Sequence, residues 1–364
     1  MAIETENRPI LRWWRGTRTG VSGSSECPIR GVQFAEVIRR GAVYVVLVLL
    51  IVAGALSYPS FLSAQNIGNI ATQAAPIILA ALGMTFVLLP AEIDLSVGSL
   101  ISIVSVIVAN GMQGRDSLVL PVLILALLAG AFTGLVNGVL TTGLRIPSFI
   151  VTLAMLLILQ GINLVWTAGA PSSTLAPSFN GLTGREVLAI PVGVYVVVAA
   201  MLVVHFVLKR TYVGRLLFLI GSNPRAVHIA GIAVAPIKTL AFVLSGVLAA
   251  CAGIFLTSYV GSGQSWLGAG MELTAIAATV IGGTDLFGGR GSAAAAVGGG
   301  LLLTVIFNLL IFMGVPSEYD PVATGAILLA GIGIYLASES HLSWRQALRH
   351  TRAAMSNWFL SKRL

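Results

Sequence analysis

Charged residues are scarce in this chain, and lysine is almost absent. Of the 364 residues, 9% are charged, and the lysines are Lys209, Lys238 and Lys362. None of these lysines follows a glycine-rich phosphate-binding loop, so we expect no nucleotide site on this chain. Cysteine occurs twice, at Cys27 and Cys251, which implies no disulfide framework.

Residues typical of catalysis are also few. The four histidines are scattered without metal-ligand spacing. No Ser/His/Asp or Cys/His arrangement falls in one layer of the apolar sequence. We therefore predict no catalytic residue, no metal site and no cofactor bound by this chain, and an enzyme is the least supported class.

Apolar sequence is abundant: 57% of the residues are hydrophobic, and they gather in long runs. A helix of about 20 residues spans the roughly 30 Å of hydrocarbon in a bilayer. The sequence predicts an all-α polytopic membrane protein with about ten transmembrane helices, the eighth of them short. The runs cover residues 42–61, 68–90, 95–112, 119–143, 149–168, 189–208, 236–258, 272–284, 292–314 and 320–338. We expect residues 1–41 to form a basic N-terminal tail, 42–338 a transmembrane domain, and 339–364 a C-terminal tail.

The basic residues fall almost entirely on alternate links between these runs. If residue 1 is cytoplasmic, 19 of the 21 Lys and Arg residues lie on the inner side, and Arg115 and Arg185 lie outside. Basic residues are costly to translocate in short links, so this split predicts that both termini are cytoplasmic. Topology and anionic inner-leaflet lipid then account for the net charge of +8, and no nucleic-acid partner is expected.

Acidic residues within the apolar domain would be needed by an ion-coupled carrier. Nine of the thirteen acids lie in the tails, in outer links or just past the last run. The other four are Glu92, Asp94, Glu272 and Asp285, and each is expected near a helix end rather than at mid-depth. Energy for transport is therefore expected to come from another subunit.

Small residues recur at helical spacing in several runs, which suits close packing of helices in lipid. Gly130 and Gly134 have G-x-x-x-G spacing, and Ser245, Ala249 and Gly253 form a stripe. We expect these to be packing faces; the alternative is that they are points at which helices bend during transport.

Three polar stretches interrupt the apolar pattern. The first, Glu92 to Ser99, contains Asp94, Ser96 and Gly98. Asp94 or Ser96 is suited to cap the N-terminus of the third helix, where a carboxylate or hydroxyl satisfies free N–H groups. The alternative reading places this stretch on a cytoplasmic gate.

The second stretch is the inner link of residues 209–235. Asn223 and Pro224 predict the start of a short helix that ends near Gly231. Such a helix either lies in the headgroup layer or docks into a soluble partner.

The third stretch, Gly282 to Ser292, is rich in glycine. Glycine-rich loops before helices can cradle phosphate, but here no strand precedes the loop and no lysine follows it. A tight cytoplasmic turn between two helices is the preferred interpretation.

Together these stretches resemble the permease family of ribose-type sugar ABC importers, and the likeness runs from about residue 64 to 338. The I-D-L-S-V-G-S motif corresponds to Ile93–Ser99, the G-G-T-x-L-F-G-G-R-G-S motif to Gly282–Ser292, and the stretch from Ile146 to Leu153 fits the start of the fifth span. The central-loop pattern of the family is matched by Gly214, Arg215, Gly221, Asn223, Ala226, Gly231 and Ile232.

The resemblance implies the membrane subunit of a bacterial inner-membrane ABC importer for a monosaccharide. Its partners would be an ABC ATPase subunit that binds ATP and magnesium, a periplasmic sugar-binding protein, and a second permease copy, identical or different. The central-loop residues named above would couple the permease to the ATPase. The gate and cytoplasmic motif residues would be Asp94, Ser96, Gly98, Asp285, Gly288, Gly289 and Arg290.

A small uncharged sugar needs only hydroxyl and amide partners along its path. Candidate partners are Asn137, Gln160, Asn163, Thr274 and Asn308. The alternative role for each is an interhelical hydrogen bond.

Two other transport classes stay open. A branched-chain amino acid ABC permease would carry a zwitterion and require charge partners at the binding step. A secondary carrier or channel would need no ATPase. The ligand retained by the cognate binding protein distinguishes the first alternative, and co-purification with an ATPase subunit distinguishes the second.

Overall fold

The computed structural model describes residues 29–172, 174–331 and 333. Most of the predicted N-terminal tail, the end of the tenth predicted span and the C-terminal tail lie outside these residues. The predicted domain boundaries at residues 41 and 338 therefore stay predictions.

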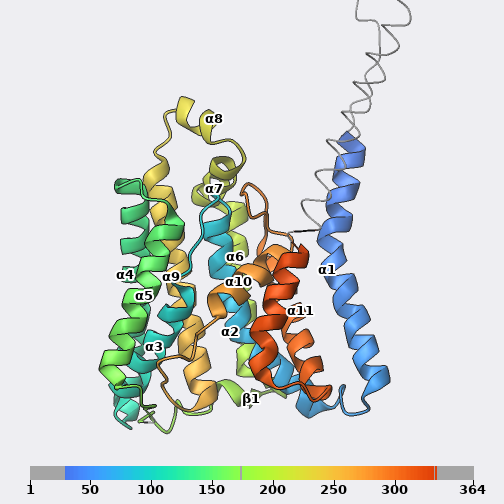
Figure 1. Cartoon of the computed structure of the whole chain (residues 1–364), viewed down its shortest axis with the longest axis vertical. Coiled ribbons are helices and arrows are strands. Elements are labelled where there is room, and N and C mark those ends of the chain that lie inside the picture. Colours follow the sequence, from blue (N-terminus) through green and yellow to red (C-terminus); the bar gives the residue numbers. More distant parts are fainter. Residues whose placement is uncertain (1–28, 173, 332, 334–364) are drawn as a thin grey trace, which may run out of the picture. The chain divides into compact units, whose positions relative to one another are not determined.

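The described chain is built from helices joined by short links (Figure 1). The helices are α1 (Ile29–Ser57), α2 (Ala64–Leu88), α3 (Val97–Met112), α4 (Val119–Gly143), α5 (Ser148–Thr167), α6 (Val192–Arg210), α7 (Tyr212–Ser222), α8 (Pro224–Ile229), α9 (Val234–Val260), α10 (Met271–Ile281) and α11 (Ala293–Phe312). Residues 320–331 begin a further helix. A two-residue antiparallel pair, β1 (Glu186–Val187) and β2 (Ile190–Pro191), lies between α5 and α6.

Within the described residues, six helices are long and apolar enough to cross a bilayer. They are α2, α4 with the turn before it, α5, α6, α9 and α11. Further apolar segments are shorter, among them the apolar part of α1, α3 and α10. Helix length therefore supports a multi-pass membrane protein but does not establish the predicted count of ten helices. α1 begins at Ile29 rather than at residue 42, because its first turns are charged and a hydropathy pattern does not register them.

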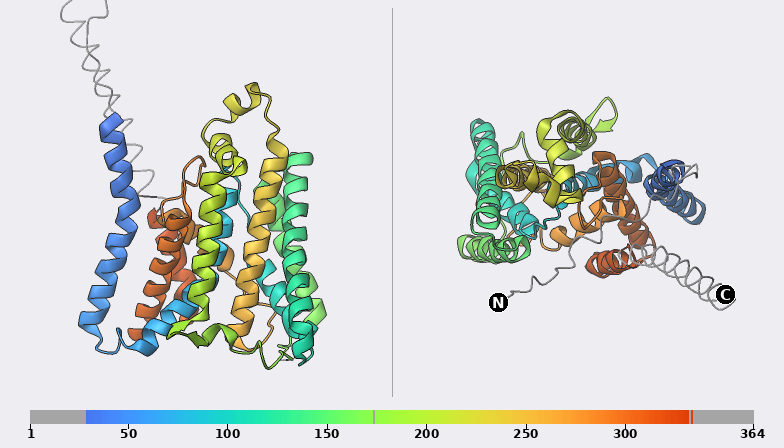
Figure 2. Two further views of the ribbon diagram at one scale, coloured as in Figure 1. Left: turned by 180° about the vertical axis from the view of Figure 1, so that it is seen from behind. Right: turned by 90° about the horizontal axis from the view of Figure 1, so that it is seen from above.

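The links between helices lie at two ends of the bundle (Figures 1 and 2). One, here called the α8 end, carries the α4–α5 link, α7, α8 and the α10–α11 turn. The other, the β1 end, carries links 113–118, 168–191 and 261–270. These three links are joined: Gly114 N donates to Thr174 O at 2.8 Å, and Ser172 and Gly263 form a β-bridge.

The centre of the bundle is α9, which contacts α2, α3 and α4. A Cβ at Gly134 would come within 3.0 Å of Phe242 O, and one at Gly246 within 3.0 Å of Gly130 O. The backbones of α4 and α9 therefore touch at the predicted face of Gly130 and Gly134, as is common where helices pack in lipid. On α9 this contact is made at Phe242 and Gly246, whereas Gly253 of the predicted stripe packs against Ile101 O of α3. The packing interpretation is confirmed for Gly130, Gly134 and Gly253.

Candidate functional site

The link of residues 209–235 contains two helices rather than one. α7 begins at Thr211, whose Oγ1 accepts a hydrogen bond from Gly214 N at 3.2 Å. α8 begins at Asn223, whose Oδ1 accepts from Ala226 N at 3.0 Å, and Gly231 follows with φ 68°. The short predicted helix is confirmed. The sequence reading missed α7, because eleven residues between two polar segments resemble a loop.

α8 projects from the bundle (Figure 1). Arg225, Ala226 and His228 are exposed, and Ile229 is 85% exposed. The segment has its own small apolar cluster of Leu216, Ile220 and Val227. α7 and α8 thus form a supported protrusion that is suited to dock into a soluble partner.

Two of the predicted motif stretches meet the end of α2 beneath this protrusion. Gly289 N donates to Leu89 O, just past the C-terminus of α2, at 2.8 Å. A Cβ at Gly221 in α7 would come within 3.0 Å of both Leu89 O and Gly289 N. We call Leu89, Gly221, Gly288 and Gly289 the glycine junction. Backbone atoms of α7 therefore contact both the end of α2 and the α10–α11 turn.

The α10–α11 stretch is a tight turn, as predicted. Asp285 N donates to Arg290 O at 2.9 Å, and Asp285 Oδ1 accepts from Phe287 N at 3.0 Å. Gly288 and Gly289 have φ values of 89° and 76°, which suit glycine. Arg290 is exposed beside the junction.

The Glu92–Ser99 stretch caps α3 through Asp94 rather than through Ser96. Asp94 Oδ1 accepts from Ser96 N at 3.0 Å just before the first residue of α3, whereas Ser96 makes no side-chain capping bond. Asp94 is also 1% exposed and accepts a hydrogen bond from Ser245 Oγ, near the middle of α9, at 3.1 Å. Asp94 therefore lies near a helix end, as expected, but this end packs beside the middle of α9. The helix break lies inside the bundle, which a sequence pattern does not reveal.

Gly98, in the same stretch, packs where two short helices begin. A Cβ there would come within 3.0 Å of Glu272 Oε2 and Gly268 O. The first turns of α3 and α10 are therefore close neighbours within the bundle. The gate role assigned to Asp94, Ser96 and Gly98 stays a prediction.

A cleft opens at the α8 end where α4, α5 and α9 meet. It has a volume of about 410 Å³ and includes Glu92, Thr141, Arg145 and Lys238 in its wall. Lys238 Nζ pairs with the Glu92 carboxylate, so α9 is tied to the segment after α2.

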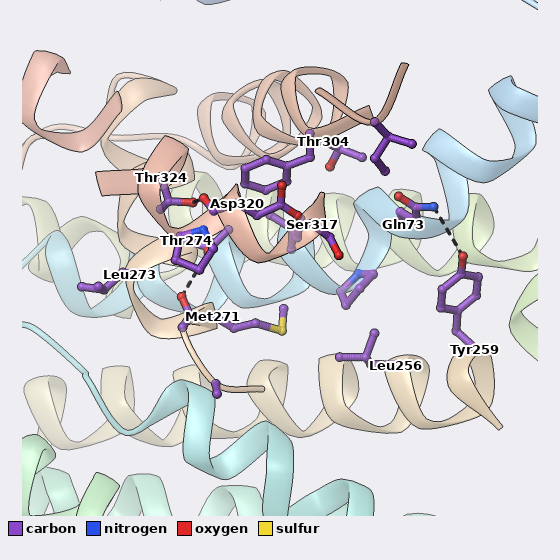
Figure 3. A pocket seen from close by; sticks show the side chains of 17 residues that line it. Gln73, Leu256, Tyr259, Met271, Leu273, Thr274, Thr304, Ser317, Asp320 and Thr324 are labelled. Atoms are coloured by element: carbon purple, nitrogen blue, oxygen red, sulfur yellow. Dashed lines mark hydrogen bonds between the residues drawn. The ribbon is translucent and has the colours of Figure 1, made fainter. Parts of the chain in front are cut away.

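A second cavity, of about 390 Å³, lies among α2, α9, α10, α11 and the helix that begins at residue 320 (Figure 3). Its polar lining comes from one amide, several hydroxyls and one carboxylate: Gln73, Tyr259, Thr274, Thr304, Ser317, Asp320 and Thr324. Phe307, Leu256 and Met271 supply apolar surface. Gln73 Nε2 donates to Tyr259 Oη at 3.4 Å, and Thr324 Oγ1 donates to Asp320 O at 2.9 Å. This mixture suits a small polar solute.

The five candidate path residues separate into two groups. Thr274 lines the 390 Å³ cavity, and Gln160 is exposed beside a cleft with Ser265 and Trp266. The three asparagines are buried. Asn137 bonds Ser96 Oγ, Asn163 bonds Ser265 O, and Asn308 bonds Asn66. The alternative role as an interhelical hydrogen bond therefore holds for Asn308, whereas Asn137 and Asn163 bond the segment before α3 and the 261–270 link.

The sequence reading missed most of the cavity lining. Gln73, Tyr259, Thr304 and Asp320 come from four separate helices. A single Thr or Tyr in an apolar run carries no distinctive signal, and only the packing of the helices brings these side chains together.

Comparison with known proteins agrees with the motifs. A family model described as "Branched-chain amino acid transport system / permease component" matches residues 66–332. The chain is 36% identical over 295 residues to "Ribose import permease protein RbsC" of Haemophilus influenzae, covering 79% of this chain and 90% of that protein. It is 37% identical over 303 residues to RbsC of Bacillus subtilis, covering 83% and 94%.

A further relative is "Autoinducer 2 import system permease protein LsrC" of Enterobacter sp., at 37% identity over 297 residues, covering 81% of this chain and 84% of that protein. No solved structure matches the chain. The family match and these relatives confirm the resemblance drawn from the motifs: the chain belongs to the permease family that contains the ribose import permeases.

Proposed function

We propose that this chain is the transmembrane subunit of an ABC importer that carries a monosaccharide across the bacterial inner membrane. Two permease subunits would work with ABC ATPase subunits, which bind ATP and magnesium, and a periplasmic binding protein would deliver the sugar. The named relatives support this, since ribose import permeases match about four-fifths of the chain. The branched-chain amino acid alternative and the ATPase-independent carrier are less supported.

The proposal includes ten crossings with both termini in the cytoplasm. Arg145, the α7–α8 protrusion and Arg290 share the α8 end, whereas Arg115 and Arg185 belong to links at the β1 end. The positive-inside rule then favours a cytoplasmic α8 end. α3 and α10 would each complete a crossing as a short helix joined to an extended segment.

The observation that carries the proposal is that the α7–α8 protrusion contacts the end of α2 and the α10–α11 turn at the glycine junction. A chain that binds no nucleotide needs a rigid contact through which a partner moves it. α8 offers an exposed docking surface, and α7 reaches the ends of α2 and the α10–α11 turn through the glycine junction. ATP-driven motion at α8 would thus be transmitted to helices that line the cavity at the β1 end.

The cavity at the β1 end is suited to be the outer mouth of the sugar path. Its hydroxyls and amide would pair with sugar hydroxyls, and its apolar wall would contact the carbon skeleton. Thr274 is the predicted path residue that lies there.

Uptake by reconstituted vesicles tests the proposed function. The purified chain is inserted with or without its ATPase subunit, and labelled ribose is supplied with the binding protein. We expect ATP-dependent accumulation only when all three proteins are present. Accumulation with this chain as the sole protein would establish a secondary carrier instead. A binding protein that retains a branched-chain amino acid rather than a sugar would favour the other permease class.

A further inference from the structure

A buried group of oxygen atoms lies where the chain breaks between α2 and α3. We call Asp94, Ser96, Asn137 and Ser245 the Asp94 cluster. Asp94 Oδ1 accepts from Ser96 N at 3.0 Å and from Ser96 Oγ at 2.6 Å, and Asp94 Oδ2 accepts from Ser245 Oγ at 3.1 Å. Asn137 Nδ2 donates to Ser96 Oγ at 2.9 Å. The cluster therefore joins the break to α4 and α9.

The carboxylate of this cluster is buried and has hydroxyl and N–H donors but no basic partner. All four side chains are at most 1% exposed. Lys238 reaches the same break but pairs with Glu92, and Glu272, packed against Gly98, adds another acid nearby. Within the part of the chain that the structure describes, Asp94 makes no ion pair. A buried carboxylate is strongly unfavourable unless a positive charge or a proton compensates it.

A second atom in the cluster distinguishes a cation from a proton. Asn137 Oδ1 is buried and has no hydrogen-bond partner. A proton on Asp94 would neutralise the carboxylate but leave the amide oxygen unpaired, whereas a cation held between Asp94 and Asn137 would pair with both. A carboxylate and an unpaired acceptor in one cluster argue against an anion as ligand.

The donor atoms indicate which kind of cation fits. The cluster offers carboxylate, amide and hydroxyl oxygens, which hard cations prefer over softer nitrogen and sulfur ligands. Among the described residues, no group of three His, Cys, Asp or Glu side chains is placed to hold a metal ion. One carboxylate with neutral oxygens balances a single positive charge. Breaks in transmembrane helices are a recurrent setting for such ions.

We propose that the Asp94 cluster binds a sodium-sized monovalent cation that neutralises Asp94 and fixes the α2–α3 break to α4 and α9. The site is independent of the solute that the bundle carries. Its role is to hold in place the segment that follows Leu89 in the glycine junction. Loss of the ion would loosen that segment.

Thermal unfolding of the purified full chain in detergent tests the site directly. Sodium chloride is exchanged for choline chloride at constant ionic strength and neutral pH. We expect the wild-type unfolding midpoint to rise with sodium and to saturate, because a ligand that binds only the folded state stabilises it. Asp94→Asn should abolish the sodium response, and Glu186→Gln, in the β1–β2 pair, should leave it unchanged.

Two further variants keep the test decisive if Asp94→Asn does not fold. Ser245→Ala removes one ligand and should raise the half-saturating sodium concentration about tenfold. Asn137→Asp adds a carboxylate and should lower that concentration and introduce a response to calcium. An equal response to choline and sodium, a sodium response unaltered in these variants, or a midpoint that follows pH alone would each overturn the proposal.

Discussion

Asn66 and Asn308 pair through both ends of their amide groups. Asn66 Nδ2 donates to Asn308 Oδ1 at 3.0 Å, and Asn308 Nδ2 donates to Asn66 Oδ1 at 2.9 Å. Asn66 also donates to Phe61 O at 2.8 Å. The two side chains are 7% and 4% exposed, so neither has water as an alternative partner. At the residue scale, Asn308 therefore ties α2 to α11.

Removing one member of this pair should destabilise the bundle. We expect Asn308→Leu to lower the free energy of unfolding by about 1–2 kcal/mol, because Asn66 is left with unpaired buried atoms. Denaturant unfolding of the purified chain measures the loss. Asn66→Leu should cost a similar amount, and the double variant should cost less than the sum of the two.

Gln160→Leu is the matched control, since this amide is exposed and should change stability little. Strictly additive losses in the double variant would show that the two amides do not depend on each other. The pairing would then have no energetic role.

At the scale of elements, the position of α7 depends on Gly221, which has no side chain. Gly221 lets the helix approach Leu89 O and Gly289 N, and an added methyl group has no flexible side chain to displace there. The glycine junction therefore joins the α7–α8 protrusion to the end of α2 through backbone contacts. If the coupling proposal holds, a side chain added at Gly221 should weaken this connection.

Gly221→Ala should separate α7 from the junction while the helices still insert. We expect ATP-driven uptake to fall by about tenfold, which corresponds to a coupling loss of ~1.4 kcal/mol, while ATP hydrolysis continues. Uptake and hydrolysis are measured together in vesicles. Gly68→Ala, at a helical glycine of α2 with no atom within 4 Å, is the control. Normal uptake by Gly221→Ala would contradict coupling through the junction.

Ala226→Glu tests the docking surface itself. Ala226 is exposed in the first turn of α8, where an acidic side chain is compatible with the helix dipole. We expect an unchanged unfolding midpoint and weaker co-purification of the ATPase subunit. Leu188→Glu, also at an exposed position but at the β1 end, should leave co-purification intact. Undiminished binding in Ala226→Glu would exclude this face of α8 as the docking surface.

Local signals explain which elements the sequence predicts. Asn223, Pro224 and Gly231 define α8 because capping and positive φ are properties of a few adjacent residues. The depth of Asp94 depends on where the neighbouring α9 lies, and no local pattern encodes it. The same limit applies to the cavity lining, whose members come from separate helices. For Asn137 and Asn308, the sequence predicted that the side-chain amide would form a hydrogen bond, but not with which residue.

At the scale of the whole molecule, hydropathy and charge carry different information. Six helices among the described residues are long and apolar enough to cross a bilayer, whereas α3 and α10 are apolar but shorter, as the run predicted at 272–284 already indicated. Charge asymmetry is unaffected by where a helix begins, because it depends only on which end each link occupies. The grouping of links into the α8 and β1 ends therefore allows orientation to be tested at two exposed positions.

Cysteine labelling from opposite sides of the membrane gives that test. In a background with Cys27 and Cys251 replaced by Ala, His228→Cys places a thiol on the exposed surface of α8, and Leu188→Cys places one at the β1 end, where Leu188 is 88% exposed. We expect an impermeant maleimide added to intact spheroplasts to label Leu188→Cys only, and to label His228→Cys only after lysis. The reverse pattern would place α8 outside the cell and remove its access to any cytoplasmic ATPase. Labelling of both sites in intact cells would show that the two ends share one side of the membrane, which contradicts the proposed crossings.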